Sequence, residues 1–348
     1  MINWKAESKK IVITVLLIFL AVLLYKKTTG VYTEMKRYSD VLWISFPSNG
    51  VEKEKVDSII IENNQGKNNK HMTIWKELAN QSITNPDLYR NVNVDMIIIA
   101  GKANLLFNTS INLEEDDEKG CVISQSLAKK LFGDINVKNC KVIYQEEEFL
   151  IRDVLEKQFK GDLIAIRPGS HMELPFDSMI VEKQNVHSSS LALQNKIFQQ
   201  YELEGVLVEF DLFTEFIAFY LLMPIALITF LFVKYSLSDK QKELSLSGKF
   251  LLKPRFYVGI KVTIGIIVIL FWILNLREIL WLSDDVIPSA WSDFDFFQNL
   301  FNEKSEALIY FLQKSKGYFE LQYVLNTFKI FLLNFLSFLC LRYAAYIN

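Results

Sequence analysis

The sequence contains few of the residues from which metal and catalytic sites are built. Its 348 residues include 3 histidines and 3 cysteines. The histidines, at positions 71, 171 and 187, have no companion at the spacing of metal ligands. Acidic pairs such as Asp116-Asp117 fall in predicted turns, where solvated charge is the ordinary explanation. We therefore expect no catalytic residue, no metal site and no cofactor bound by this chain.

The sequence also lacks an excess of either charge. Lys and Arg number 38 against 40 Asp and Glu, a formal net charge of −2, which gives no reason to expect nucleic acid as a partner. Hydrophobic residues make up 51% of the chain and aromatic residues 14%. This content is high for a soluble domain and low for a protein that lies wholly in a membrane. A bundle of membrane spans with one sizeable soluble domain fits better.

Four apolar segments with almost no internal charge are spaced unevenly along the chain: Ile11–Tyr25, Phe216–Val233, Phe256–Leu276 and Ile330–Ile347. A helix of about 20 such residues crosses roughly 30 Å of hydrocarbon and satisfies its own backbone hydrogen bonds. The sequence therefore predicts a membrane α-helical protein with four transmembrane helices, one before and three after a large insert. Lysines flank the first segment and no small residues follow it, so we expect an uncleaved anchor.

The short connections between the later segments set the expected orientation. The connection at 234–255 carries six basic residues against Asp239 and Glu243, which places it in the cytoplasm. The connection at 277–329 is mainly acidic and is expected outside. With four crossings, both termini face the cytoplasm, and residues 28–212 face outward from the cell membrane.

The expected parts of the chain follow from these segments. The cytoplasmic N-terminus and the first helix occupy 1–27, and the outer domain occupies 28–212. The second helix follows at 213–233, the cytoplasmic loop at 234–255 and the third helix at 256–276. An outer connection with an amphipathic helix at 277–329 leads to the fourth helix at 330–348.

The insert alternates strand-like runs with helical patterns, which predicts an α+β domain. The clearest helical patterns are Met72–Ala79 and Ser124–Phe132. In the second pattern, Leu127 and Leu131 share one face, and Gly133 ends the helix. The strand-like runs are Val41–Phe46, Ser58–Ile61, Val94–Ala100, Val122–Ile123, Lys141–Tyr144, Phe149–Val154, Leu163–Ile166, Met179–Val181 and Val206–Phe210.

One part of the insert resembles a known family. The run Cys121-Val-Ile-Ser-Gln-Ser-Leu-Ala-Lys-Lys-Leu-Phe-Gly-Asp134 is similar to the signature of the periplasmic core domain of MacB-type permeases, and strand-like runs follow it in the family's order. The resemblance covers about Val94–Ile166. Three positions depart from the family pattern, because Cys140 stands in place of a glycine and Arg152-Asp153 replaces an apolar-glycine pair.

The cytoplasmic loop also resembles part of this family. Its members carry a Lys-Glu-Ile-Gly-like segment after the second span, on the face that meets an ATPase, and Lys242-Glu243-Leu244 matches the start of that segment. The resemblance implies five ATPase-coupling residues: Lys240, Lys242, Glu243, Leu244 and Leu246. The alternative is a basic loop that rests on anionic lipid headgroups without a protein partner.

The resemblance implies a function for the whole chain. It identifies the chain as a MacB/FtsX-type (type VII) permease subunit of a bacterial ABC transporter complex. The phosphate-binding motif Gly-x-x-x-x-Gly-Lys-Ser/Thr is absent, so ATP would be bound by a separate P-loop ATPase subunit. A second permease copy or a related permease, and membrane lipids, are the other expected partners.

The activity itself stays open between two classes. Such a permease would export a peptide, antibiotic or lipid-like substrate, or transmit a mechanical signal across the membrane. The alternative is an ATPase-independent membrane immunity or sensor protein whose outer domain binds a toxin or peptide.

Three smaller features also have two interpretations each. Cys121 and Cys140 form a disulfide or stay as two thiols. Pro224 interrupts the second span and is either a hinge or a kink that bundle packing tolerates. The outer connection repeats apolar residues at helical spacing, which indicates an interfacial helix on the outer leaflet or, as the sharper hypothesis, a lateral gate or docking site. Its apolar residues are Phe294, Phe297, Leu300, Phe301, Leu308 and Phe311.

Overall fold

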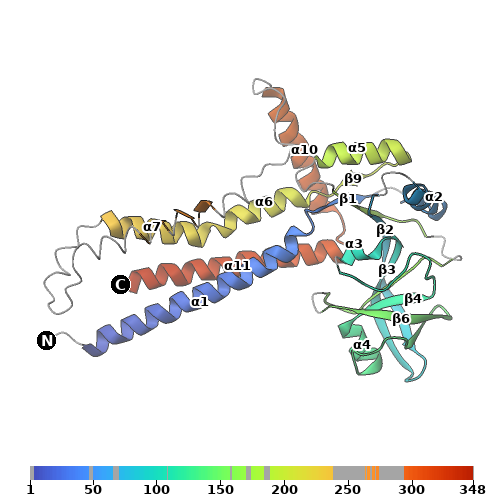
Figure 1. Cartoon of the computed structure of the whole chain (residues 1–348), viewed down its shortest axis with the longest axis horizontal. Coiled ribbons are helices and arrows are strands. Elements are labelled where there is room, and N and C mark those ends of the chain that lie inside the picture. The colour runs from blue at the N-terminus through green and yellow to red at the C-terminus, as the bar shows by residue number, and fades with distance from the viewer. Residues whose placement is uncertain are drawn as a thin grey trace. The chain divides into compact units, whose positions relative to one another are not determined.

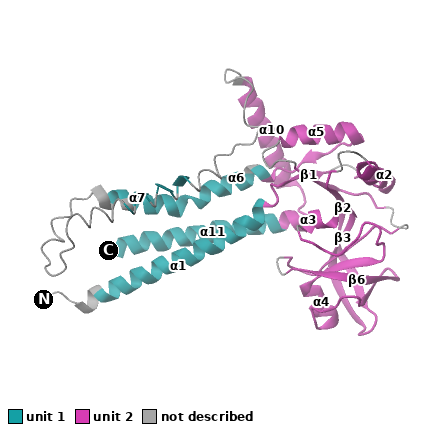
Figure 2. Cartoon of the chain, viewed as in Figure 1, with its two compact units in different colours: residues 1–36, 211–282, 322–348 teal, residues 37–210, 283–321 magenta. Residues whose placement is uncertain are grey.

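The structure, a computed structural model, divides the chain into two compact units (Figure 2). The helical unit comprises Met1–Lys36, Asp211–Leu282 and Gln322–Asn348, and the sheet unit comprises Arg37–Phe210 and Ser283–Leu321. The described residues are 4–46, 50–65, 70–107, 109–156, 159–169, 174–183, 189–237, 263, 265–266, 269–270, 272–273 and 294–347.

Among the described residues, three helices are long and apolar enough to cross a membrane: Ser8–Lys36, Phe213–Leu231 and Tyr318–Ile347. They correspond to the first, second and fourth predicted spans. The predicted third span, 256–276, lies largely outside the described residues, as does the loop at 238–255. The protein therefore has the apolar helices of a membrane protein.

The helical unit contains α1 (Trp4–Lys36), α6 (Phe210–Leu221), α7 (Met223–Leu237) and most of α11 (Tyr318–Ile347). The chain departs from the helix at Leu222, two residues before Pro224. This break is expected, because proline lacks an N–H and cannot donate the helical hydrogen bond to the main-chain oxygen four residues before it.

Polar contacts connect α11 to both α1 and α6, and α1 and α11 run side by side (Figure 1). The Ser337 hydroxyl donates to the main-chain oxygen of Ala21 at 3.0 Å. The Asn334 amide donates to the main-chain oxygen of Tyr220 at 2.7 Å. Helices in lipid gain little from apolar contact with one another, so such hydrogen bonds help to specify their pairing.

The sheet unit is built on nine strands in the order β3-β7-β4-β6-β5-β2-β8-β1-β9. Because β2 also pairs with β3, the first six strands form a closed circuit, and β8, β1 and β9 extend from it. The strands are β1 Val41–Ser45, β2 Met72–Asn85, β3 Arg90–Gly101, β4 Gly120–Ser124, β5 Lys141–Tyr144, β6 Glu147–Leu155, β7 Leu163–Ile166, β8 Ser178–Glu182 and β9 Val206–Leu207.

Helices complete the mixed α and β architecture of this unit. They are α2 Lys53–Gln65, α3 Ala103–Phe107, α4 Gln125–Phe132, α5 Ser190–Tyr201 and α10 Phe294–Gln313. The predicted strand-like run at Ser58–Ile61 is wrong, because these residues belong to α2. Its Ile59 is buried, and the neighbouring Ile60 packs against the same core.

The predicted helix at Met72–Ala79 is also wrong, because these residues begin the 14-residue strand β2. Its first half pairs with β3 on one side and β8 on the other, and Met72 and Ile74 are buried in the core. A strand that is covered on both faces need not alternate apolar and polar residues. The spacing of apolar residues in this segment therefore resembled that of a helix. A shift in the pairing register with β3 between Leu78 and Gln81 further disturbed the alternation expected of a strand.

The helix of the signature motif is confirmed as α4. The Ser124 hydroxyl accepts the N–H of Leu127 at 3.2 Å and so caps the N-terminus. Gly133, at a φ of 83°, ends the helix in the left-handed conformation that glycine adopts without strain. Leu127 and Leu131 are both fully buried.

Cys121 and Cys140 are both free thiols, so the disulfide interpretation is corrected. Cys121 pairs with Ile151 across β4 and β6, and Ile151 donates its N–H to Cys140 on the other side of β6. A whole strand therefore lies between the two cysteines. Two strand spacings amount to roughly 9–10 Å, which exceeds the distance of about 7 Å that a disulfide can bridge.

Candidate functional site

The chain passes between the two units at three described positions. These passages lie after Lys36, after Phe210 and after Leu321, at the end of α1 and near the starts of α6 and α11. An aromatic residue of the sheet unit stands within two residues of each passage, namely Tyr38, Phe210 and Phe319. These residues mark the ends through which the sheet unit is covalently connected to the helices.

Trp43 of β1 contacts all three of these aromatic side chains. Its ring centroid lies 5.3 Å from that of Tyr38, 5.2 Å from that of Phe210 and 6.1 Å from that of Phe319. Its Nε1–H donates to the main-chain oxygen of Tyr38 at 3.0 Å, so the polar atom of the ring is paired. Trp75 of β2 packs against both Trp43 and Phe319. We call these five residues the junction cluster.

The junction cluster belongs to a close-packed interior. Trp43, Trp75 and Phe319 are 6%, 2% and 3% exposed. Protein interiors are packed as densely as organic crystals, and they change between discrete arrangements rather than deforming continuously. A shift of one of these rings must therefore displace its neighbours.

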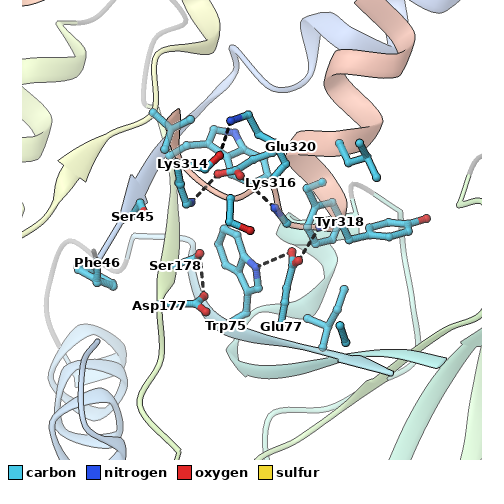
Figure 3. Close-up of a pocket in the computed structure, with 18 of the residues that line it drawn as sticks. Ser45, Phe46, Trp75, Glu77, Asp177, Ser178, Lys314, Lys316, Tyr318 and Glu320 are labelled. Carbon is cyan, nitrogen blue, oxygen red and sulfur yellow. Dashed lines mark hydrogen bonds and ion pairs between the residues drawn. The ribbon is translucent and has the colours of Figure 1, made fainter. Parts of the chain in front are cut away.

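A cavity of about 710 Å³ adjoins the junction cluster (Figure 3). The strands β1, β2 and β3 and the turn between α10 and α11 supply its walls. Its charged lining residues are Glu77, Asp95, Asp177, Lys314, Lys316 and Glu320. Lys314 pairs with Glu320 at 2.6 Å, and the Lys316 ammonium donates to main-chain carbonyls of its own turn.

Glu77 of β2 holds the first turn of α11 from inside this cavity. Its Oε2 accepts the main-chain N–H of Tyr318 at 2.5 Å, and its Oε1 accepts the Nε1–H of Trp75 at 3.4 Å. Glu320 accepts the N–H of Gly317 at 3.1 Å, in the manner of a capping box. Two N–H groups that a helix start leaves unpaired are thus bound by carboxylates, which also interact favourably with the helix dipole.

Gly317 makes the approach of Glu77 possible. A Cβ at this position would lie 2.5 Å from Oε2 of Glu77, well inside van der Waals contact. The turn is further fixed by the Tyr318 hydroxyl, which donates to the main-chain oxygen of Lys160 at 2.8 Å. The start of α11 is therefore bound to the sheet unit by both main-chain and side-chain groups.

Burial raises the pKa of the Glu77 carboxyl from 4.5 to about 7, and the nearby Asp177 and Glu320 carboxylates act in the same direction. The hydrogen bonds from Tyr318 and Trp75 lower the pKa but do not offset the burial. Glu77 therefore changes charge near neutral pH, at the point where β2 meets α11. Asp177 itself pairs with Lys76 at 3.0 Å.

No family model matches the sequence, and no curated protein matches it. Among solved structures, this chain is similar to the periplasmic region of MacB from Actinobacillus actinomycetemcomitans, with 11% identity and a TM-score of 0.40. That match covers 51% of this chain and 92% of the MacB chain. The extracellular domain of the noncanonic ABC-type transporter YknZ from Gram-positive bacteria is similar at 11% identity and a TM-score of 0.35, over 46% of this chain and 94% of that chain.

The coupling residues expected from the sequence lie outside the described residues, which end before Lys240 and resume after Leu246. Of the other expected site residues, Cys121 and Cys140 are brought to opposite sides of one strand and form no site. Trp43, Glu77 and Gly317 were not recognised in the sequence. Glu77 and Gly317 are separated by 240 positions, and no local pattern indicates that they meet.

We predict that Gly317→Ala and Glu77→Ala disrupt the same contact. Each substitution should speed the amide hydrogen exchange of residues 314–321 about tenfold, because a hydrogen bond to a charged group contributes roughly 1.5–3 kcal/mol. The double variant should exchange little faster than Glu77→Ala alone, since the new methyl group then meets no carboxylate. Gly169→Ala is the matched control, because its Cβ would meet Glu147 at an ordinary 3.8 Å. Fully additive effects would show that the two residues act separately.

We also predict a pH dependence of stability that resides in Glu77. Its pKa is raised in the folded protein to about 7, so its contribution is fully present below about pH 4.5 and is lost as the pH rises through 7. Glu77→Gln, which is neutral throughout, should match the wild type at pH 5 and exceed it by about 1–3 kcal/mol at pH 8. Thermal unfolding of the full chain at both pH values measures this. Equal differences at both pH values, or the same pattern for the exposed Glu147→Gln, would contradict it.

Proposed function

We propose that this chain is the permease subunit of a bacterial ABC transporter complex, in which ATP hydrolysis by a separate ATPase moves the sheet unit on the extracytoplasmic side. The proposal is supported by the sequence resemblance at Cys121–Asp134, by three helices apolar enough to span a membrane, and by the absence of a phosphate-binding motif from the sequence. The sheet unit then lies outside, and both termini lie in the cytoplasm.

The single observation that carries the proposal is the contact of Trp43 with all three described passages between the units. Tyr38 follows α1, Phe210 begins α6 and Phe319 belongs to the first turn of α11. A change in the position of any of these helix ends alters the packing around one buried ring. The cluster is thus suited to convert movements of helices into a movement of β1 and the strands paired with it.

The ATPase would meet the loop at 234–255. In this proposal Lys240, Lys242 and Glu243 form ion pairs with the ATPase, and Leu244 and Leu246 occupy a groove on it. The chain supplies one permease unit, so a second copy or a related permease completes the complex. The moving sheet unit would expel a peptide, antibiotic or lipid-like substrate, or activate a partner outside the cell.

Purification in mild detergent followed by ATPase assays tests this function. A P-loop ATPase should co-purify in stoichiometric amount, and Lys242→Glu combined with Glu243→Lys should abolish the permease-stimulated ATPase activity while the protein still inserts into the membrane. The matched control is Lys141→Glu combined with Glu148→Lys, which exchanges the charges of an exposed ion pair in the sheet unit and should leave the activity unchanged.

Two results would contradict the proposal. Unchanged stimulation in the Lys242/Glu243 variant would remove the coupling role of the loop. Reproducible absence of an ATPase from the purified protein would favour an immunity or sensor protein that works without ATP.

A further inference from the structure

Helix α10 presents a row of large apolar side chains that the sheet unit does not cover. Successive residues of a helix are about 100° apart, so residues 297, 301, 308 and 312 lie along one side. Four apolar side chains on or near this side are well exposed, namely Phe297 at 40%, Phe301 at 71%, Ile309 at 52% and Leu312 at 66%. We call them the apolar row of α10. Soluble proteins seldom expose several large apolar side chains next to one another.

The sheet unit fixes how α10 is rotated. Lys304 forms an ion pair with Glu209 at 2.6 Å, and both side chains are largely buried. The Tyr310 hydroxyl lies 3.2 Å from the Ser45 hydroxyl, and Phe311 packs against Phe210 with ring centroids 5.8 Å apart. Tyr310 lies opposite the apolar row, and Lys304 and Phe311 lie beside it. These contacts fix the rotation of α10 and leave the apolar row exposed.

The same contacts place α10 beside the residues that lead into two apolar helices. Glu209 lies four residues before the candidate span that begins at Phe213. The last residue of α10, Gln313, lies five positions before Tyr318, where the candidate span of α11 begins. The five steps of chain between these residues reach at most about 18 Å. The end of α10 is thus held within this distance of the start of α11.

We infer that α10 lies in the membrane interface, with Phe301 and Leu312 inserted at the boundary between lipid headgroups and acyl chains. A surface helix of this kind has one apolar side and one charged side. The exposed Glu306 and Asn299 are on the side opposite the inserted residues. The inference rests on the proposed function only in assuming that the candidate spans cross a membrane.

Lipid fits the apolar row better than a second copy of the chain does. The four side chains expose on the order of 400 Å², whereas a stable protein interface buries about 800 Å² on each partner. A lipid surface has no such minimum, because its contact with α10 is supported by the neighbouring spans.

Spin labelling of the full chain in lipid nanodiscs tests the inference. Labels are attached at Phe301→Cys and Leu312→Cys, with Glu306→Cys and Asn299→Cys as matched water-facing controls, after replacement of the three native cysteines by alanine. Collision with oxygen, which concentrates in lipid, is compared with collision with a water-soluble nickel chelate. The oxygen-to-nickel ratio should be at least fivefold higher at 301 and 312 than at 299 and 306.

Two results would overturn the inference. Equal ratios at all four positions would show that the apolar row faces water. Low access to both reagents at 301 and 312, with magnetic broadening between labelled copies, would show that a second copy covers it. Native protease resistance of each variant confirms that it is folded. The measurement needs no ATPase, so its failure would leave the proposed permease function to be decided by its own test.

Discussion

The sheet unit depends on one packing constraint, the contact of Trp43 with the residues at which the chain leaves for α1, α6 and α11. A tryptophan in the middle of a sheet strand has little freedom once aromatic rings surround it. Tyr38, Phe210 and Phe319 are therefore fixed relative to β1, although each lies at or near the end of a different helix. The strands paired with β1 and these three residues form one packed body at this point.

Electrostatics reinforces the same connection from β2, which is separated from β1 by β8. Glu77 on β2 binds the start of α11, and its carboxyl has a raised pKa because burial opposes the charge. If α11 moved away and water entered, the pKa would return toward its ordinary value and the group would release its proton near neutral pH. Separation of α11 from the sheet is thus linked to the proton concentration around the sheet unit. Packing positions the helix, and ionisation adjusts how firmly it is held.

The local features of the fold could be predicted from the sequence, and the contacts between distant segments could not. Gly133 acts within a few residues of the helix that it ends, so the end of α4 was predicted correctly. The pattern at Met72–Ala79 misled because the first four residues of β2 are all buried, in a sheet whose partner strands no short window contains. Trp43 and Glu77 meet partners more than 200 positions away, and their roles depend on a topology that periodicity does not encode.

The central claim is that the junction cluster responds to events in the membrane helices. Hydrogen exchange of the complete complex, compared with and without a non-hydrolysed ATP analogue, tests this most directly. Peptides that cover residues 38–46 and 314–321 should change their exchange by several fold, while β5 and β6 keep theirs. Unchanged exchange at both junction peptides, in a complex shown to bind the nucleotide, would contradict the account.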